Sequence, residues 1–294
     1  MLFLIGIVIV LASVLGGYMA NGGHMEVLFQ PFEFVIIVGA AIGGLVVGSP
    51  SNVLKGLGGG FKVLLSGVPY QKKKPYMDLM GFFFELSKAM RTKGIKDVEQ
   101  HIDHPHESSL FQKYPSLMKD HHVEAFICDN VRLIVMGSGM PNQLEELMDE
   151  ELHIHHTERS MIVGAMQGMA DGMPALGIVA AVLGVIHTMG SITEPPEILG
   201  HLIGAALVGT FSGVLIAYGF VGPMGKNMES AYASEAAFYL CAKIAILNFA
   251  RQLSPQIIAE FTRKHMPASV RPSFQESEEF LNSLSGMSSS SEAK

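Results

Sequence analysis

The sequence predicts an all-α, polytopic membrane protein with four transmembrane helices and a helical cytoplasmic domain. The mean hydropathy is +0.34, and only 16% of the residues are charged, whereas charged residues make up about 25% of an ordinary soluble domain. In addition, all 20 Lys and Arg residues fall in two blocks, which are separated and preceded by long apolar runs. The composition therefore indicates a bilayer, and the charge distribution indicates how the chain threads it.

The four predicted spans are apolar runs of nearly the same length. An α-helix rises about 1.5 Å per residue, so roughly 19 residues cross a hydrocarbon core of about 30 Å. Runs close to that length are Leu2–Ala20, Phe32–Gly48, Gly172–Gly190 and His201–Gly222. The first run is longer than the apolar part of a secretory signal, about 7–15 residues, and no basic segment precedes it. We therefore expect it to remain as a helix.

The basic residues predict the topology. Lys and Arg near spans are retained on the cytoplasmic side, so the blocks Lys55–Arg159 and Lys226–Lys294 should be cytoplasmic. The connectors Asn21–Phe32 and Ser191–Gly200 contain no basic residue and should face the other side. Both termini are then expected in the cytoplasm.

The spans divide the chain into five segments. Helical spacing of apolar residues in Tyr76–Arg91 and Val123–Met136 predicts a helical middle domain, and the serine-rich end is typical of a disordered tail. The predicted segments are a first transmembrane hairpin (1–49), a cytoplasmic helical domain (50–171), a second transmembrane hairpin (172–222), a C-terminal cytoplasmic helical region (223–280) and a disordered tail (281–294).

Several kinds of function are disfavoured. The net charge of −7 comes from interleaved charges of both signs, which argues against a nucleic-acid partner. No nucleophile–base pair, phosphate loop or metal-ligand spacing is visible, so we expect no enzyme, no metal site and no cofactor. Cys128 and Cys241 lie in predicted cytoplasmic segments, where packing roles are expected.

The spans contain few ionisable groups. A charged side chain at a helix centre costs roughly 2.5–3.5 kcal/mol and usually marks an ion route. Glu33 and Asp171 are expected at span ends, so no carboxylate is predicted at mid-depth. His187 and His201, near the outer ends, are either interfacial hydrogen-bonding residues or part of an ion entrance. If ions cross, a partner helix should supply the titratable group.

Prolines and glycines mark the helices that could move or pack closely. Pro174 and Pro223 are predicted at the same cytoplasmic depth of two antiparallel spans, where each either ends a helix or forms a hinge. Glycines four residues apart allow close packing, within one subunit or between subunits. These pairs are Gly39/Gly43, Gly44/Gly48 and Gly209/Gly213.

Several strings of residues, most of them in the third and fourth spans, are specific enough to indicate a family. The third span carries the string Asp171-Gly-Met-Pro174-Ala-Leu-Gly-Ile-Val-Ala-Ala181, and the fourth carries Val208-Gly-Thr210-Phe211 and Ala217-Tyr218-Gly-Phe220-Val-Gly-Pro223. Shorter matches are Gly16-Gly17-Tyr18, Gln30-Pro31, Leu147-Met-Asp-Glu-Glu151 and Arg271-Pro-Ser-Phe274. Through these strings the chain resembles the MotA family of bacterial flagellar stator subunits, in order from the N-terminus to about Phe280.

The resemblance implies a function and its partners. MotA-like proteins form a homo-oligomeric ring in the bacterial inner membrane around a MotB-like subunit, which has a peptidoglycan-binding domain and an ion-binding membrane aspartate. Ion flow through this proton channel drives torque on the rotor protein FliG. The implied function is thus a non-enzymatic stator subunit, and the partner's aspartate would be the titratable group that this chain lacks.

The resemblance also assigns roles to residues. The family's functional prolines fall on Pro174 and Pro223, which favours the hinge interpretation. Its rotor-contact charges fall on Arg91 and Glu99, with Glu151 as a third; without the resemblance these would be solvated surface charges.

The choice of ion follows from two positions in the ion pathway. Sodium-driven relatives tend to carry a threonine hydroxyl where this chain has Ala181, and a sodium ion needs oxygen ligands that a methyl group cannot provide. Thr210 remains a polar lining residue for either ion. We therefore expect the transported ion to be H⁺.

Other interpretations remain open. An ExbB/TolQ-like energiser of an outer-membrane system is the alternative, although those relatives usually have three spans. A permease should have more spans and a polar site at mid-membrane. The many cytoplasmic histidines are expected at solvated or rim positions, with a pH-dependent rotor contact as the other possibility; they are His101, His104, His106, His121, His122, His153, His155 and His156.

Overall fold

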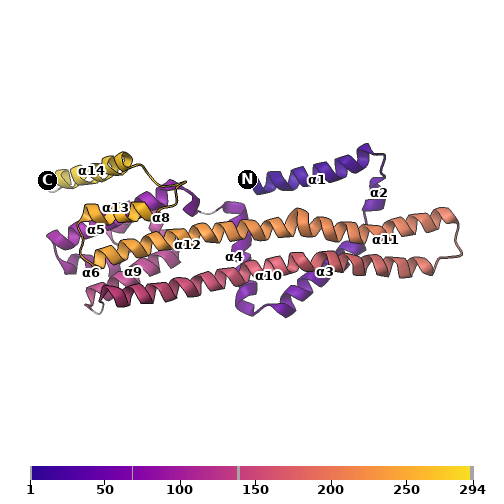
Figure 1. The fold of residues 1–294 in the computed structure, drawn as a ribbon, viewed down its shortest axis with the longest axis horizontal. Coiled ribbons are helices and arrows are strands. Elements are labelled where there is room, and N and C mark those ends of the chain that lie inside the picture. Colours follow the sequence, from indigo (N-terminus) through magenta and orange to yellow (C-terminus); the bar gives the residue numbers. More distant parts are fainter. Residues whose placement is uncertain (1, 68, 138–139, 292–294) are drawn as a thin grey trace. The chain divides into compact units, whose positions relative to one another are not determined.

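The chain folds into helices throughout the part that the computed structural model describes, which is residues 2–67, 69–137 and 140–291 (Figure 1). No strand occurs among these residues, so the all-α prediction is confirmed. The helices are α1 (Leu2–Ala20), α2 (Met25–Leu28), α3 (Pro31–Gly48), α4 (Ser51–Ser66), α5 (Lys73–Thr92), α6 (Ile95–Asp103), α7 (Ser109–Lys113), α8 (Pro115–Met118), α9 (His121–Val135), α10 (Pro141–Met189), α11 (Pro196–Ile216), α12 (Gly222–Ala250), α13 (Pro255–His265) and α14 (Phe274–Ser291), with a 3₁₀ turn at Pro69–Gln71 and a π-helix at Ala217–Val221.

Four helical stretches are long and apolar enough to cross a membrane, judged by length and composition. They are Phe3–Ala20, Met25–Gly48, Pro141–Met189 and Pro196–Ala250. Each coincides with or contains one of the predicted spans to within one residue at its ends, but the last two are much longer than a bilayer requires. The predicted third and fourth spans are therefore parts of helices that continue well beyond the apolar run.

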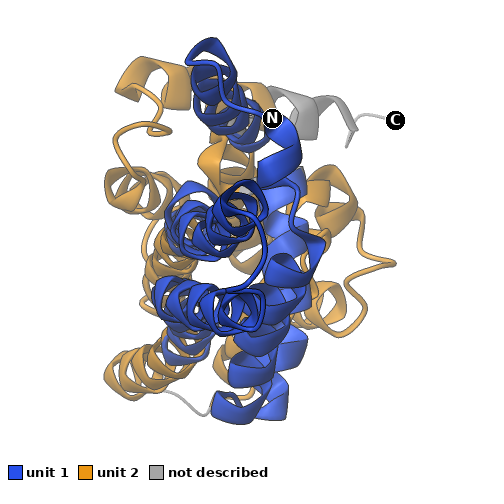
Figure 2. Cartoon of the chain, turned by 90° about the vertical axis from the view of Figure 1, so that its right-hand side faces the viewer, with its two compact units in different colours: residues 1–67, 157–231 blue, residues 68–156, 232–294 orange. Residues whose placement is uncertain are grey.

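The chain divides into two compact units (Figure 2). Unit 1 consists of residues 1–67 and 157–231, and unit 2 consists of residues 68–156 and 232–294. The predicted boundaries at 50 and 171 need correction, because α4 belongs to unit 1 and α10 passes residue 171 without a break. The reason is packing: a Cβ on Gly56 of α4 would lie 2.5 Å from the Ile162 side chain of α10.

Unit 2 is organised around α5. This helix has buried residues almost continuously from Pro75 to Ser87, and it packs against α6, α7, α8, α13 and α14. Aromatic rings fill the core: Phe82 lies 4.6 Å from Phe111 between ring centroids, and Tyr70 stacks on Phe238 at 4.4 Å. The predicted helical cytoplasmic domain is thus a closed helical core.

Unit 1 has few large buried side chains. Both α2 and α3 pack against α11, and α1 packs against the π-helix. Nearly all the large apolar side chains of α1 and α3 remain at least partly exposed, and Ile37 is the large one that is fully buried. Such a surface is expected where lipid or another helix provides the surroundings.

The C-terminal helix corrects one prediction. Residues 281–294 were expected to be disordered, but α14 continues to Ser291. Leu281 and Leu284 pack against the core of unit 2, so the helix gains apolar contacts beyond Phe280. Residues 292–294 lie outside the described part of the chain.

Candidate functional site

The two long helices of unit 1 meet along a seam of glycines. A Cβ on Gly177 of α10 would lie 2.8 Å from the Gly209 carbonyl oxygen, and one on Gly213 of α11 would lie 2.8 Å from the Met173 carbonyl oxygen. No real side chain tolerates such distances to a backbone atom, so the two backbones are in direct contact. The predicted glycine pair Gly209/Gly213 therefore packs within the subunit.

The ion-pathway candidates Ala181 and Thr210 lie at this seam. A Cβ on Gly209 would lie 2.9 Å from the Ala181 backbone nitrogen, and Thr210 is the next residue of α11. Both Ala181 and Thr210 are half-buried. The structure thus brings together two positions that are 29 residues apart in the sequence, on helices that touch through glycine.

Pro174 lies in the interior of α10, one residue from the contact of Met173 with Gly213. A proline has no N–H group, so the carbonyl of the residue four positions earlier, Ala170, loses its helical hydrogen bond. The interpretation of Pro174 as a helix end is therefore wrong, and the interior position favours a hinge.

Pro223 directly follows a change of helix type. The π-helix Ala217–Val221 precedes it, and the Gly222 N–H donates to the Ala217 carbonyl, five residues back. Single π turns commonly interrupt the regular backbone hydrogen bonds of an α-helix, and they occur at functional positions. Pro223 too lies within a continuous helical stretch, Pro196–Ala250, rather than at its end.

The two prolines do not share one depth, which corrects the prediction. Pro174 is adjacent to the Met173–Gly213 contact, whereas Pro223 is two residues before Gly225, whose Cβ would lie 3.3 Å from Gln167 Oε1. The prolines are therefore about five to seven residues apart, or about 8–10 Å, along α10. The prediction assumed spans that end at the prolines, but both helices continue past them.

Glu33 lies in the first turn of α3, at the end of its own span as predicted, but its side chain reaches the seam of α10 and α11. Cβ atoms on Gly209 and Gly184 would lie 2.8 Å and 3.4 Å from its two carboxylate oxygens, so the carboxylate occupies a notch in the seam. Its Oε2 is buried and has no hydrogen-bond partner among the described residues. Gly209 is eight residues into the predicted fourth span, so a carboxylate does lie beside the middle of the helices.

The reason for this depth is the connector before α3. The connector residue Val27, on α2, lies 3.7 Å from a Cβ on Gly204, so the connector lies along α11 and α3 begins beside the middle of that helix. The signal in the sequence was a single Glu in the first turn of an otherwise apolar run, two residues after Pro31.

A second line of small residues in unit 1 is not covered by any other part of the described chain. A Cβ added to Gly44, Gly48, Gly164, Gly168 or Gly172 would meet no atom within 4 Å, and these glycines line a hollow of about 750 Å³ between α3 and α10. The glycine pairs Gly39/Gly43 and Gly44/Gly48 therefore make no close contact within the described chain. Helix packing against another membrane segment is the remaining interpretation for them.

The predicted rotor-contact charges lie on the surface of unit 2. Arg91, in the last turn of α5, and Glu99, on α6, are both exposed. Arg91 donates through Nη2 to the Gln252 carbonyl oxygen at 2.9 Å. Gln252 has a φ of 55° in the turn after α12, a conformation uncommon outside glycine. Arg91 thus also fixes this turn.

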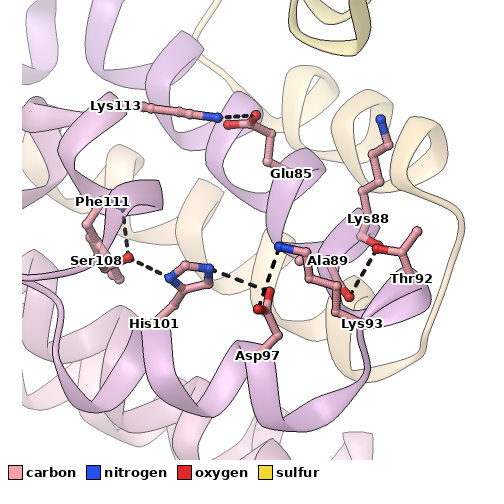
Figure 3. A network of polar contacts seen from close by, with 10 residues as sticks. All are labelled: Glu85, Lys88, Ala89, Thr92, Lys93, Asp97, His101, Ser108, Phe111 and Lys113. Carbon is pink, nitrogen blue, oxygen red and sulfur yellow. Dashed lines mark hydrogen bonds and ion pairs between the residues drawn. The ribbon is translucent and has the colours of Figure 1, made fainter. Parts of the chain in front are cut away.

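A polar network holds α6 in place (Figure 3). Asp97 Oδ2 lies 3.6 Å from His101 Nε2, and Asp97 Oδ1 lies 3.7 Å from Lys93 Nζ. His101 Nδ1 is 2.8 Å from Ser108 Oγ, which accepts the Phe111 N–H at the start of α7. Burial lowers the pKa of His101, against an opposing effect of Asp97. The helix that carries Glu99 is thereby positioned against its neighbours.

The remaining predicted residues occupy different environments. Glu151, on α10, is exposed and accepts a hydrogen bond from Asn130 Nδ2 at 3.2 Å. None of the eight cytoplasmic histidines is buried, as expected for solvated or rim positions: six are exposed, His101 is half-buried, and half-buried His155 lies 3.6 Å from Glu235. No group of three or more His, Cys, Asp or Glu residues within the described ranges could hold a metal ion.

These features define a class of protein. Four helices long and apolar enough to cross a membrane, a glycine-lined seam, interior prolines and a second helical unit are features of a polytopic membrane protein. Two family models match the chain. The model described as "Motility protein A N-terminal" matches residues 4–94, and the model described as "MotA/TolQ/ExbB proton channel family" matches residues 118–238.

Similar proteins agree with this class. The chain is 39% identical over 284 residues to Motility protein A of Salmonella typhimurium and to that of Escherichia coli, covering 97% of this chain and 96% of each relative. It is 33% identical to Chemotaxis protein LafT of Vibrio parahaemolyticus, over 96% of this chain and 99% of the relative. The fold is similar to C. jejuni MotAB (TM-score 0.76, 17% identity, 92% and 98% of the two chains) and to the Bacillus subtilis MotAB stator complex (TM-score 0.74, 22% identity, 91% and 96%).

The chain belongs to the motility protein A family, within the MotA/TolQ/ExbB proton channel family. It is a multi-pass inner-membrane subunit of the flagellar stator, a component of a motor rather than an enzyme.

Proposed function

We propose that this chain and a MotB-like subunit form a channel in which inward proton flow moves a ring of copies of this chain against the rotor protein FliG. The observation that carries the proposal is the seam of α10 and α11, where Pro174, Ala181 and Thr210 lie beside a direct backbone contact. Helix α10 lacks one backbone hydrogen bond at Pro174, next to a glycine contact, so α10 and α11 can shift against each other there as the partner's aspartate is protonated.

The ion is proposed to be H⁺. The Ala181 methyl group offers no oxygen ligand beside Thr210, whereas Na⁺ must exchange its hydration shell for oxygen atoms. The titratable group that carries the proton is assigned to the membrane aspartate of the partner, whose peptidoglycan-binding domain would hold the complex still. Both termini of this chain are proposed to be cytoplasmic, on the basis of the basic blocks.

Arg91 and Glu99 are proposed to contact complementary charges on FliG. Exposed charge pairs are individually weak, about 0–1 kcal/mol, so they act as a set. The ExbB/TolQ-like alternative is less favoured, because motility and chemotaxis proteins match the chain over 96–97% of its length.

Rotation of tethered cells tests the function. Cells that lack their own stators would express this chain with its cognate partner, and rotation speed would be followed while external sodium is varied at constant proton-motive force. We expect sodium-independent rotation. A requirement for sodium would contradict the ion assignment, and absence of rotation despite membrane assembly would favour the energiser alternative.

The same assay tests the residues. The double variant Arg91→Glu, Glu99→Lys should lose rotation while membrane assembly is retained. Arg91 also fixes the turn at Gln252, so Glu99→Lys alone serves as a comparison in which this turn is left intact.

Pro174→Ala should reduce torque, whereas Pro196→Ala, at the first position of α11, should not. Normal torque in the Arg91/Glu99 and Pro174 variants would remove the site assignments.

A further inference from the structure

A hollow on unit 2 is shaped to receive one large side chain. Leu147, Glu150, Glu151 and Ile154 of α10 line it, together with residues of α9 such as Asp129. The four residues of α10 stand at positions i, i+3, i+4 and i+7, which is the spacing of the four residues that surround a knob in helix packing. The hollow measures about 290 Å³, and a cavity of roughly 150 Å³ already holds a benzene ring.

This hollow is apolar at its ends and acidic along its sides. Leu147 and Ile154 are 50% and 51% exposed, and they stand two helical turns apart on the same face of α10 as the hollow. Glu150 has no ion-pair partner among the described residues, while Asp129 is paired with Arg132 at 2.7 Å. A partner that fits should therefore bring an apolar side chain flanked by positive charge.

Helix α13 of the same unit carries a surface of that kind. Ile257 and Phe261 stand four residues apart and are 45% and 47% exposed. Lys264 and His265 follow them in the last turn and are exposed. Lys264 has no ion-pair partner within the described ranges, whereas the neighbouring Arg263 is buried and bound to Glu260. The α13 face thus presents an aromatic side chain with Lys264 beside it, and the charge of Lys264 also contributes to lowering the pKa of Glu260 one turn earlier.

The two surfaces belong to different elements. Helix α13 packs on α5, and the hollow lies between α9 and α10. One copy of the chain therefore presents a knob and a separate hole, which is the arrangement of a head-to-tail contact that closes into a ring when the rotation between copies is constant.

We propose that Phe261 of one copy inserts into the hollow of Leu147, Glu150, Glu151 and Ile154 of the next, with Lys264 beside Glu150. The occupant is a second copy of this chain, because the charges and the apolar pairs of the two surfaces complement each other. The proposal rests on the ring of the proposed function and identifies the surfaces by which its cytoplasmic units meet. It gives Glu151 a place in the contact between copies rather than at the rotor.

Cysteine cross-linking in membranes tests the contact. Glu150→Cys and Lys264→Cys would be expressed separately, together as two chains, and combined in one chain, and then oxidised. The two native thiols are buried, and burial raises the pKa of both Cys128 and Cys241 to about 12, so they should not compete. We expect no cross-link in either single variant, dimers in the mixture, and a ladder beyond dimers in the double variant.

Matched variants show whether the cross-link depends on the contact made by Phe261 or only on two cysteines being near each other. Phe261→Ala in the double-cysteine chain should lower the cross-linked fraction at least fivefold, whereas Phe274→Ala, a more exposed phenylalanine of the same unit, should leave it unchanged. Glu99→Cys combined with Lys264→Cys should give no ladder.

The outcomes are distinct from those of the rotation assay. Absence of cross-linked dimers in the mixture would overturn the proposal, whether the solubilised complex is oligomeric or monomeric. Cross-linking by Glu150→Cys alone would also overturn it, since that requires two hollows to face each other. A full ladder in cells that do not rotate would support the contact and count against the proposed function.

Discussion

Unit 1 and unit 2 contain similar apolar side chains but bury different ones. Among the described residues, the twelve largest fully buried side chains all lie in unit 2 except Ile37. Unit 1 buries a few large side chains, such as Met173 and Met228, together with small residues such as Ala180, Ala206 and the glycines of the seam. Water drives large side chains into a core, whereas in lipid, close backbone packing replaces that force. The comparison teaches that unit 1 holds its long helices together by direct backbone contact, whereas unit 2 is held together by a core of large side chains.

The helix starts differ in the same way. In unit 2, the side chains of Ser108, Asp120 and Ser254 accept backbone N–H bonds at the starts of α7, α9 and α13. In unit 1, the starts of α3, α4 and α11 have no such side-chain bond, and each has a proline at or next to the first position. Three helices of unit 2 are therefore stabilised by a side-chain cap, whereas α5, α6 and α8 of the same unit start without one.

The largest expected effect comes from removing a ring of the unit 2 core. Phe82→Ala leaves a cavity beside Phe83, Phe111 and Tyr114 and should lower the free energy of unfolding by about 3–5 kcal/mol. Phe32→Ala, at a position that is 81% exposed in unit 1, should change it little. Thermal unfolding in detergent, followed by circular dichroism, measures both; equal losses would break the comparison between the units.

The seam of unit 1 should be sensitive to added volume instead. Gly213→Val would drive its side chain into the α10 backbone, which is 2.8 Å from the Cβ position, and overpacking of this kind costs about 1–3 kcal/mol. Gly164→Val has the same change in helix propensity but open space around it. Only the first variant should lower the aggregation temperature of the detergent-solubilised chain. Equal behaviour would mean that the seam is not a packed contact.

A third prediction concerns the unpaired carboxylate of unit 1. Glu33→Gln keeps the shape but removes the charge beside Gly184 and Gly209, and we expect swimming speed to fall at least twofold without loss of membrane protein. Intramembrane carboxylates are costly and generally functional. Glu26→Gln, on the neighbouring α2, removes an exposed carboxylate and should have no effect. If cells with the Glu33→Gln variant swim normally, Glu33 is only a packing residue.

The smallest effect should be a dependence of unit 2 on pH. Burial lowers the pKa of His101 in the folded chain, and the unfolded value is about 6.5. The unfolded state therefore takes up the proton first, so stability falls as the pH is lowered through about 6.5 towards the folded pKa. His101→Gln should reduce the drop in melting temperature between pH 7.5 and 5.5. Exposed His121→Gln should leave that drop unchanged, and identical slopes for all three chains would remove the role of His101.

The sequence by itself determined the fold class, the four spans and the family. Hydropathy and helical periodicity are local properties, and the bilayer imposes a span length that any apolar run must meet. The strings around Pro174, Thr210 and Pro223 were sufficient for the resemblance that the similar proteins bear out. The rotor-contact roles of Arg91 and Glu99 and the choice of H⁺ came from the resemblance, and they remain predictions.

The tertiary structure decided what depends on contacts between distant residues. The depth of Glu33, the offset of Pro174 and Pro223 and the burial of His101 follow from which backbones touch, not from any local pattern. Helices α10 and α12 continue past the ends of their apolar runs, since hydropathy marks where a chain prefers lipid but not where a helix ends. Glycine spacing in the sequence showed that close approach was possible, and only packing showed that Gly209 and Gly213 use it within the chain whereas Gly44 and Gly48 leave it open.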